Sequence, residues 1–482
     1  MLVLVRLSSE INLKSNKVKA RFLRKLIRNI DIALKRSQVE FRIRREWNRL
    51  FIEVSSEEAV SVLSRIFGIG SISPVEYVGK PDLDDMSRIA FENYRDKVKG
   101  KSFCIRAQRN MVEGFTSKDV ENRLGDVLRD QAASVKLKNP EVKIELLISR
   151  EGAFFFSERI KGPSGLPLGV EGRALCLISG GFDSAVAAWL MMKRGIDLDF
   201  LFCNLAGIAY ERATLSVVKA LMEQWAYGSE GILYTLDFSE IIKSITANVG
   251  ARFPQIVLKR AMYRTANLLA DEIGQIPAII TGESAGQVSS QTLYNLAAID
   301  RASSRVVLRP LIGYNKDEII RKSVEIGTYV FSEHIQEYCQ ISQENPKTKS
   351  TLNQAQKEED KIDPKLYADA VAGRKKIMVN EIDSNELATE YLFTENIPDG
   401  AAVIDCRDKM QYDAWHFPGS VNIELESLLS SYKTMEKRKT YVLYCPFGLQ
   451  TAVAAEKMQK SGYEAYSFKG GSKSLKAYSE RF

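Results

Sequence analysis

The stretch Ser179-Gly-Gly-Phe-Asp-Ser184 decides the fold of the central part of this chain. A short apolar run, Ala174–Ile178, comes directly before it, and a helical pattern, Ala185–Arg194, comes directly after it. A buried strand that turns through glycines into a helix is typical of an open parallel sheet, which binds ligands at such turns. The glycines allow several backbone N–H groups to point at one anion, and the helix adds the positive end of its dipole. We therefore expect phosphate to be bound by Ser179, Gly180, Gly181 and Ser184.

The kind of phosphate chemistry follows from what the loop contains and lacks. Asp183 cannot bind phosphate directly, so we expect it to hold Mg²⁺ or to orient the loop. The loop lacks the Gly-Lys-Ser/Thr ending of a Walker loop, which argues against transfer of a γ-phosphoryl group. It resembles instead the SGGxDS loop of enzymes that split ATP between its α- and β-phosphates. The alternative is a glycine-rich turn that binds no ligand.

Further strands and helices continue this pattern along the chain. Strands are expected at Leu198–Cys203, Gly231–Leu236 and Ala278–Thr281, with helices over 211–227, 239–248 and 255–273. Short apolar strands between helices predict a doubly wound parallel sheet. The segment Thr281–Thr292 begins at the ligand-binding edge of that sheet. Lys259 and Arg260 on the third helix, and Lys316 at the start of a helix over 317–326, are expected to neutralise phosphate charge.

The first 168 residues predict two smaller α/β units. Residues 1–75 alternate short strands with a basic helix around 17–36, which suits a ferredoxin-like α+β fold. In the second unit we expect helices over 82–97 and from Ser117, and strands over 102–107, 142–148 and 153–160. The Ser-x-x-Val opening at Ser117 predicts a helix without a full capping box.

Positive charge is concentrated at the start of the chain. Residues 1–60 hold fourteen Lys/Arg and seven Asp/Glu, so 14 − 7 = +7, which equals the net charge of the whole chain. A basic domain on a neutral body indicates an anionic partner for that domain. A solubilising charged face would give the same count, and charge alone does not separate the two.

A second, smaller α/β pattern begins at Ala401, after a polar stretch over 340–397 that we expect to be helical with a mobile linker. The motifs Val403-Ile-Asp-Cys-Arg407 and His416-Phe-Pro-Gly-Ser420 resemble the opening of a rhodanese-like domain. A strand over 440–444 then delivers Cys445 to a loop before a helix. Backbone N–H groups at such a position favour a thiolate and would also stabilise a persulfide. Cys406, inside an apolar strand, is expected to be a buried structural cysteine.

Composition excludes several classes of protein. The six cysteines are scattered without a C-x-x-C pair, and the chain has only two histidines, which argues against a zinc or iron–sulfur site and against a disulfide framework. No apolar run reaches the roughly 18 residues that a membrane span needs. The first residues lack the basic and small-residue regions of a signal peptide. We therefore expect a cytoplasmic protein.

Together these motifs resemble the tRNA 4-thiouridine synthetase family, in the long form that ends in a rhodanese-like domain. The resemblance covers essentially the whole chain and implies four domains: a ferredoxin-like domain over 1–75, a THUMP RNA-binding domain over 76–168, an ATP pyrophosphatase domain over 169–390 and a rhodanese-like domain over 398–482. It implies an enzyme that adenylates the uridine at tRNA position 8 and converts it to 4-thiouridine, with release of AMP and pyrophosphate.

The resemblance also implies roles for individual residues. ATP contacts are implied for Leu177, Ile178, Lys259, Gly282 and Gln291. Asp183 and Lys316 are implied as catalytic contributors, Cys445 as the cysteine that carries the persulfide and Cys339 as its disulfide partner. RNA contacts are implied for Arg106, Arg109 and Lys161.

The implied partners are tRNA, a cysteine desulfurase that loads the sulfur, and a sulfur-carrier protein of thiamine thiazole synthesis. ATP with Mg²⁺ is the implied cosubstrate. The sequence does not fix the oligomeric state, and a homodimer is one of the alternatives. Two other hypotheses remain at this point. The chain could be a persulfide relay for thiamine synthesis in which RNA binding is secondary, or a nucleic-acid-binding protein with an inactive nucleotide fold.

Overall fold

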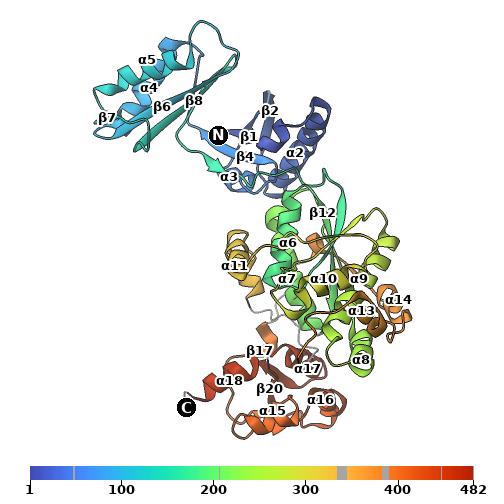
Figure 1. Cartoon of the computed structure of the whole chain (residues 1–482). Coiled ribbons are helices and arrows are strands. Elements are labelled where there is room, and N and C mark those ends of the chain that lie inside the picture. Colours follow the sequence, from blue (N-terminus) through green and yellow to red (C-terminus); the bar gives the residue numbers. More distant parts are fainter. Residues whose placement is uncertain (47–48, 206, 334–344, 383–389, 447, 481–482) are drawn as a thin grey trace. The chain divides into compact units, whose positions relative to one another are not determined.

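The computed structural model describes residues 1–46, 49–205, 207–333, 345–382, 390–446 and 448–480. The chain forms two compact units, of which the first comprises residues 1–170 with 193–195 and the second comprises residues 171–192 with 196–482. Within these described ranges the strands form four sheets, two in each unit (Figure 1). Among the described helices, none has both the length and the apolarity that crossing a membrane requires.

The first sheet has the order β10-β4-β1-β3-β2 and is antiparallel throughout. Its strands are β1 (Leu2–Leu7), β2 (Phe41–Glu46), β3 (Arg49–Val54), β4 (Ile69–Val75) and β10 (Ile160–Lys161). The basic helix α2 (Asn16–Arg36) buries an apolar stripe that includes Phe22, Leu26 and Ile30 and leaves its cationic residues toward solvent. The ferredoxin-like prediction is confirmed.

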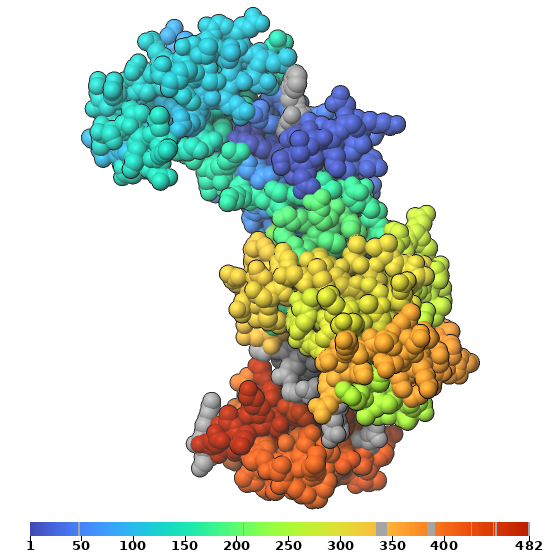
Figure 2. All heavy atoms as spheres, in the orientation of Figure 1, coloured from blue at the N-terminus to red at the C-terminus, as the bar shows by residue number. Residues whose placement is uncertain are grey.

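The second sheet has the order β5-β9-β8-β6-β7. It is built from β5 (Tyr77–Gly79), β6 (Ser102–Arg109), β7 (Ser134–Val135), β8 (Val142–Ser149) and β9 (Gly152–Phe156). Helices α4 (Leu83–Val98) and α5 (Ser117–Arg129) share one apolar core with this sheet and lie together on one of its faces (Figure 1). The residues of this segment, coloured light blue to teal, gather in one lobe in Figure 2.

Two details of this segment differ from the sequence prediction. Helix α5 does begin with a capping box, because its N-cap is Thr116, whose hydroxyl accepts from the Asp119 N–H while the Asp119 carboxylate accepts from the Thr116 N–H. The strand expected over 153–160 is in fact two strands. β9 pairs with β5 and β8, and after a break β10 pairs with β4 of the first sheet.

The third sheet has the order β15-β14-β11-β12-β13-β16 and is parallel except for β16. Its strands are β11 (Arg173–Leu177), β12 (Asp197–Asn204), β13 (Ile232–Asp237), β14 (Ala278–Ile280), β15 (Val306–Leu308) and β16 (Lys375–Met378). One face carries α8 (Ser239–Asn248), α9 (Pro254–Ile273) and α14 (Lys365–Ala372), which share its apolar core. The doubly wound prediction is confirmed. The edge strand β16 was missed, because it lies in the polar stretch that predicted only helix and linker.

The fourth sheet has the order β17-β21-β20-β18-β19 and is parallel. Its strands are β17 (Phe393–Thr394), β18 (Ala402–Asp405), β19 (Val421–Asn422), β20 (Thr440–Tyr444) and β21 (Glu464–Phe468). Helices α16 (Leu425–Ser431) and α17 (Leu449–Lys460) pack with one apolar cluster, and α18 (Gly471–Ser479) packs with another that contains Val403 and Val442. Helices therefore cover both faces, as the rhodanese-like prediction requires.

A buried ion pair ties the long helix α9 to α13 (Leu352–Glu359). The Arg260 side chain is fully buried, and its Nη2 lies 2.6 Å from Glu359 Oε2. The guanidinium also donates to the Ala298 carbonyl and to the Gln356 side chain. The expectation that Arg260 neutralises phosphate is therefore wrong, because its charge is already satisfied inside the domain.

Glu359→Gln is expected to destabilise this domain strongly, because it leaves the buried Arg260 guanidinium without a counter-charge. Breaking such a pair from one side typically costs about 3–5 kcal/mol. The free energy of unfolding from urea denaturation measures the effect. Glu325→Gln is the matched control, since its ion pair with Lys322 is on the surface and should contribute less than about 1 kcal/mol. Equal losses in the two variants would contradict the prediction.

Candidate active site: a nucleotide pocket and a sulfur-binding loop

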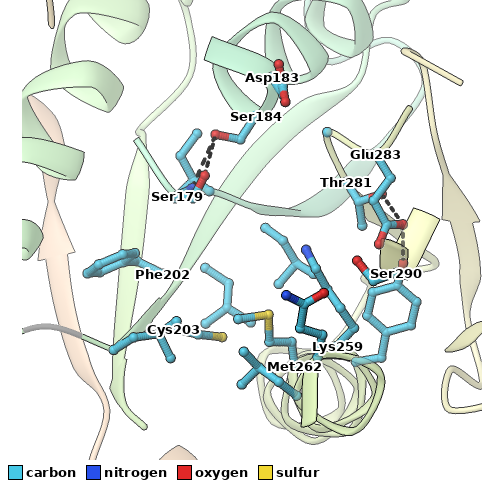
Figure 3. A pocket seen from close by; sticks show the side chains of 18 of the residues that line it. Ser179, Asp183, Ser184, Phe202, Cys203, Lys259, Met262, Thr281, Glu283 and Ser290 are labelled. Atoms are coloured by element: carbon cyan, nitrogen blue, oxygen red, sulfur yellow. Dashed lines mark hydrogen bonds between the residues drawn. The ribbon is translucent and has the colours of Figure 1, made fainter. Parts of the chain in front are cut away.

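The glycine-rich loop connects β11 to α6 (Phe182–Lys193). The helix begins three residues earlier than the sequence predicted, so Asp183 and Ser184 belong to its first turn. The Ser184 hydroxyl closes the loop by accepting from the Ser179 N–H at 3.2 Å and donating to the Gly181 carbonyl at 3.1 Å. Figure 3 shows Ser179 and Ser184 linked at the edge of the pocket. The loop is thus held in shape by its own serines.

Asp183 connects the loop to two other segments of the same domain. Its Oδ1 accepts from the Lys316 Nζ at 2.8 Å, and its Oδ2 accepts from the Gln287 Nε2 at 2.7 Å. Lys316 is the first residue of α11 (Lys316–Glu325), which has a full capping box. A carboxylate oxygen can accept more than one bond, so Asp183 retains acceptor capacity for a further ligand.

Gly282 brings the segment after β14 into contact with the loop. A Cβ at this position would lie 2.7 Å from both the Asp183 carbonyl carbon and the Ser184 nitrogen, which real side chains do not tolerate. The segment is also braced internally, because the Ser284 N–H donates to Gln291 Oε1 at 3.2 Å. Glycine is required here for close backbone approach.

One wall of the pocket holds a buried polar network around Glu283, whose side chain is only 3% exposed. Its Oε2 accepts from Tyr263 at 2.8 Å, from Thr281 at 3.0 Å and from Arg309 Nε at 2.8 Å. Burial alone would raise the pKa of Glu283, but the charges of Lys259 and Arg309 outweigh it and hold the pKa below its usual value. The other oxygen, Oε1, is buried without a partner among the described residues. Glu283 is therefore an anion that faces the pocket from a fixed position.

The pocket combines this polar wall with an apolar one (Figure 3). Its polar lining includes Ser179, Asp183, Ser184, Lys259 and Gln291, and its apolar lining includes Leu177, Ile178, Phe202, Leu205 and Met262. Backbone donors and a lysine suit phosphates, whereas the apolar side suits a flat aromatic base. The arrangement fits a nucleotide.

The second site is the loop that follows β20. Cys445 comes directly after the strand and is 2% exposed. Its Sγ accepts from the Gly448 N–H at 3.1 Å and from the Thr451 hydroxyl at 3.5 Å. Gly448 has φ +83°, and a Cβ there would lie 2.8 Å from the Phe468 carbonyl oxygen. The backbone thus curls so that donors at the start of α17 point at the sulfur, where they stabilise negative charge.

Comparisons with known proteins assign each part of the chain to a family. A family model described as "Thiamine biosynthesis protein (ThiI)" matches residues 169–363, and models for the ThiI ferredoxin-like domain, the THUMP domain and the rhodanese-like domain match residues 2–73, 80–158 and 389–478. A tRNA sulfurtransferase of Thermoplasma volcanium is 36% identical over 458 residues, which are 95% of this chain and 94% of that protein. A tRNA sulfurtransferase of Aeromonas hydrophila is 34% identical, with 96% of this chain and 98% of that protein covered. The chain belongs to the tRNA sulfurtransferase family.

A solved structure supports the assignment to the tRNA sulfurtransferases. The crystal structure of a 4-thiouridine synthetase–RNA complex with bound ATP matches 78% of this chain and 98% of that chain, with 27% identity and a TM-score of 0.68. The resemblance inferred from the motifs is thereby confirmed, and the chain is a sulfurtransferase with four domains of the predicted types.

The structure brings together most of the residues that the sequence singled out for ATP. Those that line the pocket are Leu177, Ile178, Ser179, Asp183, Ser184, Lys259, Gly282 and Gln291. Gly180 and Gly181 complete the loop, and Lys316 reaches the site through Asp183. Cys339 lies outside the described residues. The binding and catalytic roles of all these residues stay predictions.

The residues expected to contact RNA lie in the first unit. Arg106 and Arg109 are on β6, where Arg106 donates to the Leu137 carbonyl at 2.8 Å and Arg109 donates to the Val112 carbonyl. Lys161 is exposed on β10. Their charges remain accessible to phosphate, and the RNA contacts stay predictions.

Sequence reasoning missed Glu283, Gln287, Tyr263 and Arg309. Glu283 and Gln287 belong to the segment Thr281–Thr292, which the sequence pattern places at the ligand-binding edge of the sheet. Their position in that segment could have identified them as site residues. Arg309 directly follows β15, and polar residues at the carboxyl ends of parallel strands are candidates for a ligand site. Tyr263 lies inside a helix whose pattern indicated only packing.

Gly282→Ala is expected to impair nucleotide binding and turnover, because the added methyl group would push the segment after β14 away from the loop. A displacement of about 1 Å at a reacting centre can cost roughly 10²-fold in rate. Formation of AMP measures turnover, and calorimetry measures ATP affinity. Gly313→Ala is the control in the same domain, since a Cβ there meets nothing within 4 Å. Normal turnover of Gly282→Ala would show that the close approach is dispensable.

Proposed function

We propose that the protein is an ATP-dependent tRNA sulfurtransferase that converts the uridine at tRNA position 8 to 4-thiouridine. The observation that carries the proposal is the pocket in which the glycine-rich loop, Lys259, Gly282 and Gln291 converge. The relative solved with RNA and bound ATP supports both the nucleotide and the class of acceptor.

The reaction begins with attack of the uridine O4 on the α-phosphate of ATP. Pyrophosphate leaves, and the uridine C4 then carries AMP as a good leaving group. The loop N–H groups and Lys259 stabilise the charge that develops on the phosphates. Asp183 holds the loop against Lys316 and Gln287.

Sulfur is delivered by a persulfide on Cys445. The outer sulfur attacks C4, directly or after release as hydrosulfide, and AMP leaves. The Gly448 N–H and the Thr451 hydroxyl stabilise the Cys445 thiolate that accepts the sulfur. The bond to the outer sulfur breaks when a second thiol attacks the Cys445 Sγ, and the outer sulfur leaves with the electron pair. If Cys339 then closes a disulfide with Cys445, a dithiol reductant has to reopen it.

The residues present fit Mg²⁺ bound together with the nucleotide. Among the residues that the structure describes, no group of three or more His, Cys, Asp or Glu could hold a metal ion alone. Mg²⁺ prefers a few protein oxygens together with phosphates. Asp183 at the loop and the unpartnered Glu283 Oε1 are the oxygens that this chain offers there. When bound, the ion neutralises phosphate charge.

The remaining assignments are proposed with the function. tRNA is expected to contact Arg106, Arg109 and Lys161, a cysteine desulfurase to load Cys445, and the protein to work in the cytoplasm. The boundaries at 75, 168 and 390 are proposed as domain limits. A sulfur-carrier protein of thiazole synthesis is a second proposed acceptor.

The test uses purified full-length protein, an unmodified tRNA transcript, ATP, Mg²⁺ and a cysteine desulfurase with cysteine as the sulfur source. AMP and pyrophosphate are expected, and both should depend on the transcript. ADP in their place would overturn the activation chemistry, and the absence of nucleotide cleavage would favour a binding protein with an inactive nucleotide fold. Deletion of residues 1–165 distinguishes tRNA thiolation from a role as a persulfide relay. The deletion should abolish tRNA thiolation and spare sulfur transfer to a carrier protein.

A further inference from the structure

Cys406 lies beside Cys445 at the end of the fourth sheet. The parallel strands β18 and β20 are in register up to the pair Asp405–Tyr444, and the Cys406 N–H donates to the Tyr444 carbonyl at 2.8 Å. Cys406 and Cys445 are the first residues after the two strands. Neighbouring strands are about 4.8 Å apart, which falls within the Cα separation of about 4.4–6.8 Å that a disulfide spans.

The two side chains point to the same face of the sheet. Asp405 and Tyr444 face the opposite side, because side chains alternate along a strand. Cys406 packs in the cluster that contains Ala454 and Ala455 of α17, and the Cys445 sulfur accepts from donors at the start of the same helix. Both thiols therefore lie between the sheet and α17.

Cys406 is a nucleophile for which the proposed reaction has no use. Its thiol is free and 6% exposed. Burial raises its pKa well above the ordinary value, and the charge of the Cys445 thiolate raises it further. That second effect reflects how near the two sulfurs are. Because its pKa is raised, the Cys406 thiol is mostly protonated and attacks slowly. A persulfide on Cys445 therefore persists long enough to be used.

We propose that Cys406 is a second resolving thiol for the Cys445 persulfide. The inference rests on the proposed function, because it needs Cys445 to carry the sulfur. The Cys406 sulfur loses its proton and attacks the Cys445 Sγ. The bond between Sγ and the outer sulfur breaks, and the outer sulfur leaves with the electron pair as hydrosulfide. One disulfide forms, the outer sulfur is reduced, and no external oxidant is required.

The rhodanese-like domain can thus release sulfide without a partner cysteine from elsewhere in the chain. The released hydrosulfide is itself a nucleophile for an adenylated uridine. A dithiol reductant returns the Cys406–Cys445 disulfide to two thiols, so the domain can be loaded again. The pair gives the sulfur a discharge route when no acceptor is engaged.

The test uses the full chain with Cys339→Ser, which removes the other candidate partner. The protein is loaded by a cysteine desulfurase with cysteine, freed of small molecules and incubated without reductant. Non-reducing peptide mass spectrometry is expected to show the Cys445 persulfide first and a Cys406–Cys445 disulfide later, with hydrosulfide released in equal amount. Adding Cys406→Ala should reduce hydrosulfide release to background and preserve the persulfide. Adding Cys104→Ala, a buried thiol of another domain, should change nothing.

Two failures can be told apart. A persulfide that forms on Cys445 and decays at the same rate with and without Cys406 would overturn this inference and leave the proposed function intact. Absence of any persulfide on Cys445 would overturn the proposed function and this inference with it. Diamide oxidation of unloaded protein tests the geometry independently. It should link Cys406 to Cys445, and failure to do so under native conditions would also overturn the inference.

Discussion

Cys445→Ala is expected to abolish formation of 4-thiouridine while leaving tRNA-dependent release of pyrophosphate, up to one per transcript, in place. The reason is that the two half-reactions of the proposed mechanism use different sites. We place activation in the pocket lined by Ser179, Asp183 and Lys259, and the labile sulfur on Cys445 in the loop that leads into α17. The Gly448 N–H and the Thr451 hydroxyl point at a sulfur, and an alanine methyl group cannot accept from them.

The measurement pairs two assays on the same protein. Mass spectrometry of digested tRNA quantifies 4-thiouridine, with a cysteine desulfurase and cysteine as the sulfur source, and an enzyme-coupled assay quantifies pyrophosphate. Cys104→Ala is the matched control, because it removes a buried thiol from the second sheet. Full thiolation by Cys445→Ala under these conditions would assign the sulfur to another residue. Loss of pyrophosphate release as well would show that the sulfur site and the nucleotide site are coupled.

Much of the fold could be predicted because its signals are local. The run Ala174–Ile178, the glycine-rich loop and the following helix each have a pattern that can be recognised within about ten residues. The same holds for β20 and Cys445. The four sheets therefore matched the expected domain types, with strand limits that differ by one or two residues for most elements.

The wrong strand predictions have a common physical cause, which is pairing between segments that are far apart in the sequence. β16 is polar and becomes a strand only because β13 offers it an edge. The expected strand over 153–160 breaks because β4, far away in the sequence, pairs with Ile160 and Lys161. The capping box at Thr116 has a local cause instead, because its Thr116-x-x-Asp119 pattern begins one residue before the assumed helix start at Ser117.

The candidate site shows the same division. Motif residues such as Gly282 and Gln291 were found from their order along the chain. Arg260 was misassigned because neighbouring positions on a helix point to different faces, and only the structure shows that Lys259 faces the pocket while Arg260 faces Glu359. The partners of Asp183 could not be inferred, since Gln287 and Lys316 are more than 100 residues away from it.

Asp183→Asn is expected to lower the rate of AMP formation by about 10²–10³-fold, the range seen when one charge-stabilising group is lost from an active site. The carboxylate accepts from Lys316 on one oxygen and from Gln287 on the other. An asparagine would turn an NH₂ group toward one of these donors. The loop, α11 and the segment after β14 would then lose their common anchor. ATP affinity should change less than turnover, because the loop N–H groups are retained.

Asp317→Asn is the matched control, because it makes the same change of charge on an exposed residue of the first turn of α11. A double-mutant cycle with Lys316→Met then tests whether Lys316 acts through Asp183. Residues that act as one unit have non-additive effects, so the double variant should be no slower than the slower single variant. If the two losses multiply instead, Lys316 acts on the substrate independently, and Asp183 does not serve as the link between α11 and the loop.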